Sequence, residues 1–231
     1  MSSAFDEILG LTGGPVSYER THMGHIKLRE HAFPYSIRKL EFDMMTNIVT
    51  TYNLKRGYEC ATAFGVSSTA AGLGFKKTGG KLVTMDAYVE ELYNDCNAYR
   101  GANAVTHPDS DDYKSAKFLH KHFGLEDTVF CEVGWSPRDT AQTISKHFAP
   151  DEKLDFVFID AGHFPEQVLL DIDSFVPFLA DKFVLMFHDV FDHIFDARVN
   201  ARIQELFGKQ IQILVPNSTG MGDNMGILIN M

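Results

Sequence analysis

Two carboxylates and two imidazoles stand at the ends of apolar segments. Asp160 ends the segment LDFVFID, and His163 follows three positions later. His188 and Asp189 end a second segment, KFVLMFHD. Carboxylate and imidazole groups can transfer protons near neutral pH, and together they can hold a divalent metal. These four residues are therefore candidates for acid–base or metal-assisted chemistry.

The two apolar segments are predicted to be neighbouring parallel strands. Continuous apolar runs are typical of strands that are covered on both faces. Between them, Pro165 suits the first turn of a helix, and apolar residues recur at helical spacing from Val168 to Leu179. A right-handed strand–helix–strand crossover brings both strand ends to one edge of the sheet. Because ligands bind at that edge in open α/β sheets, the four side chains are expected to meet in one cleft.

A turn rich in small residues forms a second candidate site. The stretch GYECATAFGVSSTAAGLGF, residues 57–75, is predicted to be a strand that turns at Gly65 into a helix. Small residues let a ligand approach the backbone, and the helix N-terminus offers unpaired N–H groups. Asp86 ends the next strand 21 positions later, the spacing at which dinucleotide-binding sites hold ribose hydroxyls. A turn that needs glycine and a solvated acid are the plainer interpretations.

The remaining segments complete an alternating pattern of strands and helices. Strands are expected over 58–63, 81–87, 128–134, 154–160, 182–189, 211–216 and 225–231. Helices are expected over 36–52, 88–99, 113–123, 139–148 and 192–207, with a polar loop over 101–112. The last two strands have no helix between them and are predicted to form a hairpin. The pattern predicts an α/β, Rossmann-like, doubly wound fold whose seven-stranded sheet is mostly parallel, with an antiparallel strand from the C-terminal hairpin.

Length and composition indicate one soluble domain with a sizeable core. The chain has 231 residues, of which 45% are hydrophobic and 23% are charged. We expect a single domain over 1–231, with an N-terminal arm and helix over 1–54 and the core over 55–231. The net charge of -10 argues against nucleic-acid binding, and no apolar stretch approaches the ~20 residues that span a membrane. Three separated cysteines and the absence of a signal pattern favour the cytoplasm.

The element order, the motif ECATAFGVSS and the strand ends IDAGH and HDV resemble class I S-adenosylmethionine-dependent methyltransferases. The similarity is greatest to the small-molecule O-methyltransferases, which include macrolide-sugar and catechol enzymes. Their first motif typically reads Glu, apolar, Gly, Thr, two residues, Gly, any residue, Ser, and Ser or Thr. The resemblance covers about residues 36–231. It implies transfer of a methyl group from S-adenosylmethionine to a hydroxyl of a small polar acceptor, of sugar or phenol type.

The resemblance also implies which residues bind the cofactor. Asp86 would hold the ribose hydroxyls. The residues that would surround the methionine part are Glu59, Ala61, Thr62, Gly65, Ser67 and Ser68. The residues that would contact adenine are Gly134, Trp135 and Ser136.

The strand-end residues receive catalytic roles from the same resemblance. Asp160 would lie beside the transferred methyl group and the cofactor, and His163 would be the general base. In the macrolide-sugar enzymes, the acids at the positions of Asp160, His188 and Asp189 bind a divalent metal. His163 would then stay unligated and face the acceptor.

Two positions depart from the family pattern. Ala61 replaces the first glycine of the motif and adds a Cβ atom near the cofactor. His188 replaces an acid of the metal pair. Because Mg²⁺ prefers oxygen ligands, a set with histidine favours Mn²⁺, Fe²⁺ or Zn²⁺, or a site that works without metal.

Two other classes of function fit parts of the same pattern. A metal-dependent hydrolase or hydroxylase-like enzyme would use the four strand-end residues as ligands, but would need neither the Gly65 turn nor Asp86. A non-catalytic cofactor-binding module on the same fold is suggested by Ala61 alone. Binding of S-adenosylmethionine discriminates among the three. The expected partner is a small-molecule acceptor, and the composition leaves open whether the chain forms a homo-oligomer.

Overall fold

The computed structural model describes residues 3–11, 37–87, 111–215 and 225–231. The strands are β1 (Arg56–Cys60), β2 (Lys81–Asp86), β3 (Val129–Val133), β4 (Leu154–Ile159), β5 (Leu179–Phe187), β6 (Gln212–Val215) and β7 (Met225–Asn230). The helices are α1 (Ala4–Gly10), α2 (Lys39–Thr51), α3 (Val66–Thr78), α4 (Asp111–His122), α5 (Thr140–His147), α6 (Pro165–Phe175) and α7 (Ala197–Phe207), with a short 3₁₀ helix over Val176–Phe178. The predicted helix over 88–99 and most of the loop over 101–112 lie outside the described residues. None of the helices in the described ranges is both long and apolar enough to cross a membrane.

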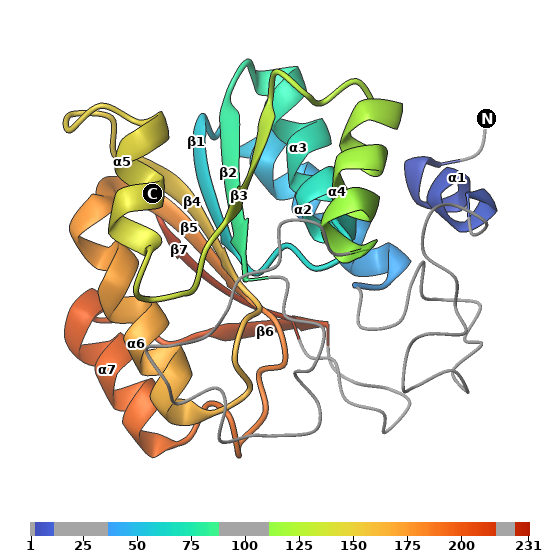
Figure 1. Cartoon of the computed structure of the whole chain (residues 1–231). Helices are drawn as coiled ribbons and strands as arrows, with labels where there is room; N and C mark the ends of the chain where they lie inside the picture. The colour runs from blue at the N-terminus through green and yellow to red at the C-terminus, as the bar shows by residue number, and fades with distance from the viewer. Residues whose placement is uncertain (1–2, 12–36, 88–110, 216–224) are drawn as a thin grey trace.

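All seven strands form one sheet in the order β3-β2-β1-β4-β5-β7-β6 (Figure 1). The pairs within β1 to β5 are parallel, whereas β7 runs antiparallel to both of its neighbours. The predicted fold, with a C-terminal hairpin that contributes the antiparallel strand, is therefore confirmed. In the central strands, Cys60 is level with Ile159, and Ile159 is level with Phe187. The segments that follow β1, β4 and β5 consequently start side by side at one edge of the sheet.

Helices cover both faces of the sheet, with α1 to α4 on one side and α5 to α7 on the other (Figure 1). Alternate side chains of β4 enter the two resulting cores: Phe156 and Phe158 pack toward the first set of helices, and Val157 and Ile159 toward the second. Successive side chains of a strand point to opposite faces, so a strand between two helical layers must be apolar throughout. This geometry explains the apolar runs Phe156–Ile159 in β4 and Phe183–Phe187 in β5.

Helix α2 buries a carboxylate among its apolar residues. Its buried positions are Glu41, Phe42, Met45 and Val49. The apolar Leu40, by contrast, has 56% of its surface exposed. The carboxylate of Glu41 therefore lies among the apolar residues that α2 buries. Its partner lies in the active-site region described below.

Helix α7 begins at Ala197, five positions later than the predicted start at 192. The side chain of Asp196 accepts hydrogen bonds from the backbone N–H groups of Arg198 and Val199, at 2.9 and 3.1 Å. An aspartate N-cap of this kind satisfies helix donors that have no partner within the helix, and it sets the first helical residue. The apolar periodicity extended across the cap, so periodicity alone placed the boundary too early.

Candidate active site

The ends of β4 and β5 bring together the four residues singled out in the sequence, which we call the strand-end cluster: Asp160, His163, His188 and Asp189. The backbone N–H of His188 donates to the carbonyl of Ile159 at 3.0 Å, so the second strand end is held against the first. Asp189 has a φ of 51°, in the left-handed region that only a few non-glycine residues such as Asp tolerate. The expected convergence at the carboxyl edge is confirmed.

His163 is the solvent-facing member of the strand-end cluster. Its Nε2 atom lies 3.0 Å from Oδ2 of Asp189 and 3.9 Å from Oδ1 of Asp160, and its side chain is 54% exposed. Desolvation lowers the pKa of His163, but the two carboxylates outweigh this effect and raise the pKa above its ordinary value. The imidazole is therefore both reachable from solvent and oriented by acids.

His188 is the buried member, with carboxylates near both ring nitrogens. Its Nδ1 atom lies 3.3 Å from Oδ1 of Asp160 and 3.6 Å from Oδ1 of Asp189. Burial lowers the pKa of His188, but the surrounding carboxylates raise it well above its ordinary value. Burial also raises the pKa of Asp160, yet His188 and His163 outweigh that effect and lower it to about 2. His188 is thus a positively charged group inside the carboxylate cluster.

Glu41 is the residue that sequence reasoning missed at this site. It is fully buried on α2, and its Oε2 atom lies 3.7 Å from Nε2 of His188. The same carboxylate accepts hydrogen bonds from the backbone N–H and the guanidinium of Arg38, at 2.7 and 3.0 Å. The signal in the sequence was an acid within the apolar stripe of a predicted helix. Its partner could not be foreseen, because 147 positions separate the two residues.

Three residues of the cluster have the spacing of a divalent-metal site. Among the described residues, one ligand atom each from Asp160, His163 and Asp189 lies within 4.8 Å of the others. The predicted ligand set contained His188 in place of His163. The ring of His188 is buried, whereas that of His163 is half exposed. Both sets share the two carboxylates, and they differ only in which imidazole supplies the nitrogen.

Glu59 lies on β1 beneath the predicted cofactor site, with 1% of its surface exposed. Neither of its carboxylate oxygens has a hydrogen-bond partner among the residues that the structure describes. Burial raises the pKa of Glu59 to about 8, against a smaller lowering by the nearby Ser67 and Thr84 side chains. Burial therefore favours the neutral form of this carboxyl group, and a nearby cation would favour the ionised form.

The segment Ala61–Gly65, which we call the cofactor turn, connects β1 to α3. Gly65 has a φ of 86° and is the N-cap of α3. A Cβ atom on Gly65 would lie 2.6 Å from Cα of Ala116 in α4, so the close approach of the two backbones also requires glycine. The N–H of Ala63 donates to Oδ2 of Asp86 at 2.8 Å. The acid at the end of β2 therefore helps to hold the turn that precedes the helix.

Two hydroxyls of the first motif are used inside the protein. Oγ1 of Thr62 lies 2.5 Å from Oγ1 of Thr84 on the neighbouring strand, and both residues are buried. The hydroxyl of Ser68 donates to the carbonyl of Gly65 at 3.1 Å and lies 2.7 Å from Nε2 of His120. These side chains therefore hold the turn through hydrogen bonds within the protein. Ala61 is half-buried, and Ser67 is buried at the first turn of α3.

The predicted adenine segment, Gly134–Ser136, follows β3 at the same sheet edge. The N–H of Gly134 donates to the carbonyl of Asp86 at 2.9 Å, and that of Trp135 donates to Asp139 at 2.8 Å. From α6, Asp171 accepts a hydrogen bond from the Ser136 hydroxyl. Burial raises the pKa of Asp171 to about 7. No sequence pattern singled out Asp171, since it lies within α6, the helix that separates β4 from β5.

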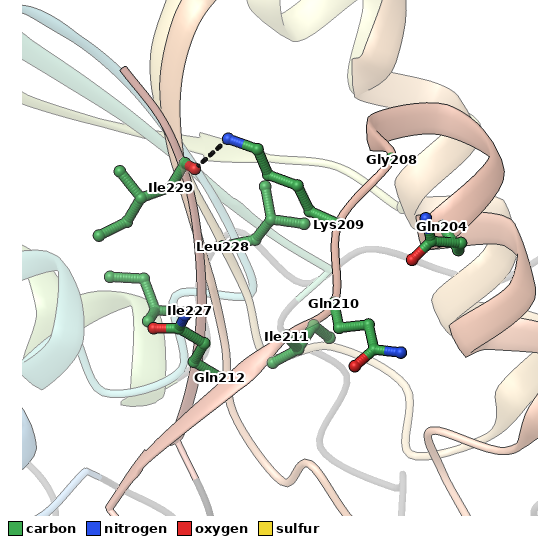
Figure 2. A pocket seen from close by; sticks show the side chains of 9 residues that line it. All are labelled: Gln204, Gly208, Lys209, Gln210, Ile211, Gln212, Ile227, Leu228 and Ile229. Atoms are coloured by element: carbon green, nitrogen blue, oxygen red, sulfur yellow. Dashed lines mark hydrogen bonds between the residues drawn. The ribbon is translucent and has the colours of Figure 1, made fainter.

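A separate hollow of about 600 Å³ lies between the end of α7 and the C-terminal strands (Figure 2). Its residues are Gln204, Gly208, Lys209, Gln210, Ile211, Gln212, Ile227, Leu228 and Ile229. Figure 2 shows the Lys209 amine donating to the Ile229 carbonyl, at 2.7 Å. It also donates to the side chain of Asn230, at 2.8 Å. Among the described residues, no acid or imidazole lines this hollow, so the candidate chemistry stays at the carboxyl edge.

Solved structures share this fold at low sequence identity. Cofactor-bound Rv0187 from MTB is 14% identical, with 100% of this chain and 90% of that chain covered and a TM-score of 0.65. The O-methyltransferase from Bacillus cereus in complex with SAH is 16% identical over 99% and 91%, with a TM-score of 0.64. The O-methyltransferase TomG from Streptomyces achromogenes in complex with SAM is 16% identical over 100% and 91%, with a TM-score of 0.61. At these identities the likeness establishes the fold.

The sequence itself identifies the family. No curated protein matches the chain at a significant level. A family model described as a methyltransferase domain matches residues 58–190, from β1 through the strand-end cluster. The match contains the cofactor turn, Asp86, the Gly134–Ser136 segment and all four cluster residues. Because it spans more than half of the 231 residues, the protein belongs to this methyltransferase-domain family.

Proposed function

We propose that this protein transfers the methyl group of S-adenosylmethionine to a hydroxyl oxygen of a small polar acceptor, of sugar or phenol type. The observation that carries the proposal is the adjacency of two features at one sheet edge. The cofactor turn leaves β1 beside the end of β4, from which Asp160 and His163 follow. A methyl donor on the turn would thus lie next to an exposed imidazole. The neighbours with bound SAH and SAM support the choice of donor.

The residues of the turn fit the chemistry of this cofactor. S-adenosylmethionine carries a sulfonium and an α-ammonium, and Glu59 is a buried carboxyl group without partners among the described residues. A nearby cation favours the ionised carboxylate, so binding would bring the raised pKa of Glu59 down. Asp86 at the end of β2 would hold the ribose hydroxyls, and Gly134–Ser136 the adenine. The close approach at Gly65 gives the methionine part access to backbone N–H groups at the start of α3.

His163 would remove the proton of the acceptor hydroxyl. When bound, S-adenosylmethionine supplies a methyl carbon activated by the positive sulfur. The acceptor oxygen would form the new O–C bond as the S–C bond breaks, and its proton would pass to the imidazole of His163. Asp189, 3.0 Å from His163, orients the ring and stabilises the imidazolium that results. The positive charge of buried His188 offsets the repulsion between Asp160 and Asp189.

A divalent metal fits the same cluster. Two carboxylate oxygens and an imidazole nitrogen are a donor set that suits Mn²⁺, Fe²⁺ or Zn²⁺ better than Mg²⁺. Asp160 and Asp189 would hold the ion together with His188 or His163. A bound ion would lower the pKa of the acceptor hydroxyl and lessen the demand on a protein base.

The first experiment is calorimetric titration with S-adenosylmethionine and its demethylated product, for which we expect micromolar dissociation constants. Transfer of labelled methyl groups to a panel of sugars and phenols, with EDTA or added Mn²⁺, then identifies the acceptor class and the metal requirement. A metal-dependent hydrolase would not bind the cofactor, and a non-catalytic module would bind it without transfer. Absence of binding at millimolar cofactor would refute the proposed function.

A further inference from the structure

Helix α4 packs directly on the cofactor turn. Ala116 and His120, four residues apart, lie on the same helical face. Ala116 occupies the space that a Cβ atom on Gly65 would need, with its Cα only 2.6 Å from that position. His120 reaches Ser68 in the first turn of α3, with 2.7 Å between Nε2 and Oγ. Two side chains of α4 thus contact the segment that would bind the cofactor.

A chain of hydrogen bonds continues from this contact into the sheet. Nδ1 of His120 lies 3.2 Å from Sγ of Cys131 on β3. At the other end, the Ser68 hydroxyl can donate its proton to the Gly65 carbonyl. With Nε2 protonated, the Ser68 oxygen accepts from the His120 ring and Nδ1 accepts from the Cys131 thiol; with Nδ1 protonated, the Ser68 hydroxyl donates to Nε2 and Nδ1–H faces Sγ. In either tautomer, His120 joins Ser68 on α3 to Cys131 on β3.

The members of this chain are neutral at any working pH. His120 is 1% exposed, and burial, together with the nearby Lys117, lowers its pKa to about 3. Burial raises the pKa of Cys131 to about 12, so the thiol keeps its proton. A fully satisfied buried network favours one arrangement of the groups it joins. Here those groups come from α3, α4 and β3.

We propose that His120 is a positioning residue for the methyl donor, because it holds Ser68 and, through it, the Gly65 carbonyl in the geometry that the cofactor turn needs for binding. This inference rests on the proposed function. A turn that is already ordered loses less conformational entropy when the ligand binds, which increases affinity. His120 itself is buried and would not touch the cofactor.

The variants separate positioning from simple core packing. His120→Gln places a side-chain amide, which can donate or accept, near the position of Nε2 and keeps a hydrogen bond to Ser68, whereas His120→Leu removes both bonds. Ser68→Ala removes the same contact from the other side with a smaller change in volume. His122→Leu, on the exposed side of α4, is the matched control; its imidazole contacts Glu7 at 2.7 Å. Calorimetry gives cofactor affinity, and circular dichroism verifies folding.

We expect His120→Leu and Ser68→Ala each to weaken cofactor binding about tenfold, and the double variant to be no weaker than either one. His120→Gln and His122→Leu should stay within about threefold of the wild type. In turnover, the KM for the cofactor should rise in the weakened variants while kcat at saturating cofactor stays unchanged.

The competing outcomes are distinct. One outcome would overturn the inference while the wild type still binds the cofactor. In that outcome Ser68→Ala and His120→Gln keep the full affinity, and His120→Leu only lowers the melting temperature. His120 would then be a residue of the core without a role in cofactor binding. If His120→Leu does not fold, His120→Ala takes its place: weaker cofactor binding supports the inference, and full affinity in His120→Ala and Ser68→Ala overturns it. If the wild type does not bind the cofactor at all, the proposed function fails, and this inference with it.

Discussion

Replacing Glu59 with glutamine should remove a pH-dependent loss of stability. Burial raises the pKa of Glu59 from 4.5 to about 8 in the folded protein, and the unfolded chain releases the proton near 4.5. Between these values only the folded state holds the proton, so the free energy of unfolding falls as the pH rises. Glutamine has nearly the same shape and does not titrate. The variant therefore lacks this decline.

The size of the effect follows from the gap between the two pKa values. At about 1.4 kcal/mol per pH unit, a gap from 4.5 to about 8 corresponds to about 5 kcal/mol when the carboxyl is fully ionised. About 3 kcal/mol of this is already lost at pH 7. Glu59 is 1% exposed, so screening by solvent does not diminish the figure. The loss is a substantial fraction of the ~5–15 kcal/mol that stabilises a typical domain.

Urea unfolding between about pH 5 and pH 9, followed by the fluorescence of Trp135, the only tryptophan, measures this difference. The stability of Glu59→Gln relative to the wild type should rise by about 1.4 kcal/mol per pH unit over most of the range between the two pKa values and level off above about pH 8. Asp171→Asn is the matched control, since burial raises the pKa of Asp171 only to about 7 and its curve should level earlier. A difference that is the same at every pH would show that Glu59 is ionised in the folded protein. The same variant should bind S-adenosylmethionine more weakly, because it lacks the carboxylate.

Further substitutions test the remaining roles. His163→Ala should lower turnover by about 10²–10⁴-fold and leave cofactor affinity nearly unchanged, whereas the exposed His193→Ala should have no effect; full activity of the His163 variant with a verified acceptor would exclude it as the base. Because Asp160 and Asp189 raise the pKa of His163, kcat/KM of the wild type should rise with pH with a midpoint above 6.5, and a pH–rate profile checks this. Asp86→Ala should weaken cofactor binding by roughly 1–3 kcal/mol in calorimetry, because it removes an acceptor that also holds the N–H of Ala63. Asp160→Asn should weaken both cofactor and metal binding, and titration with each ligand separates the two effects.

Local patterns were enough to predict the order of the described elements from α2 to β7, whereas α1 was not predicted and the helix expected over 88–99 lies outside the described residues. The uninterrupted apolar runs ending at Asp160 and His188 indicated strands buried on both faces, and the crossover rule placed their ends together. The small residues around Gly65 and the spacing to Asp86 predicted the turn correctly, because a close backbone approach requires glycine wherever it occurs. Boundaries were less accurate: α7 starts at a cap that periodicity does not reveal.

Contacts between distant segments were decided only by the tertiary structure. Glu41 faces His188 across 147 positions, and His120 bridges Ser68 and Cys131 from a helix of its own. Neither pairing follows from composition or spacing, because an acid or a histidine in an amphipathic helix has no visible partner until the helix packs. The surroundings then decide the charge of each group: burial and the nearby Lys117 keep His120 neutral, whereas the carboxylates around His188 outweigh burial and keep it positive. The sequence by itself thus determined which residues reach the sheet edge, and packing determined their partners and their protonation.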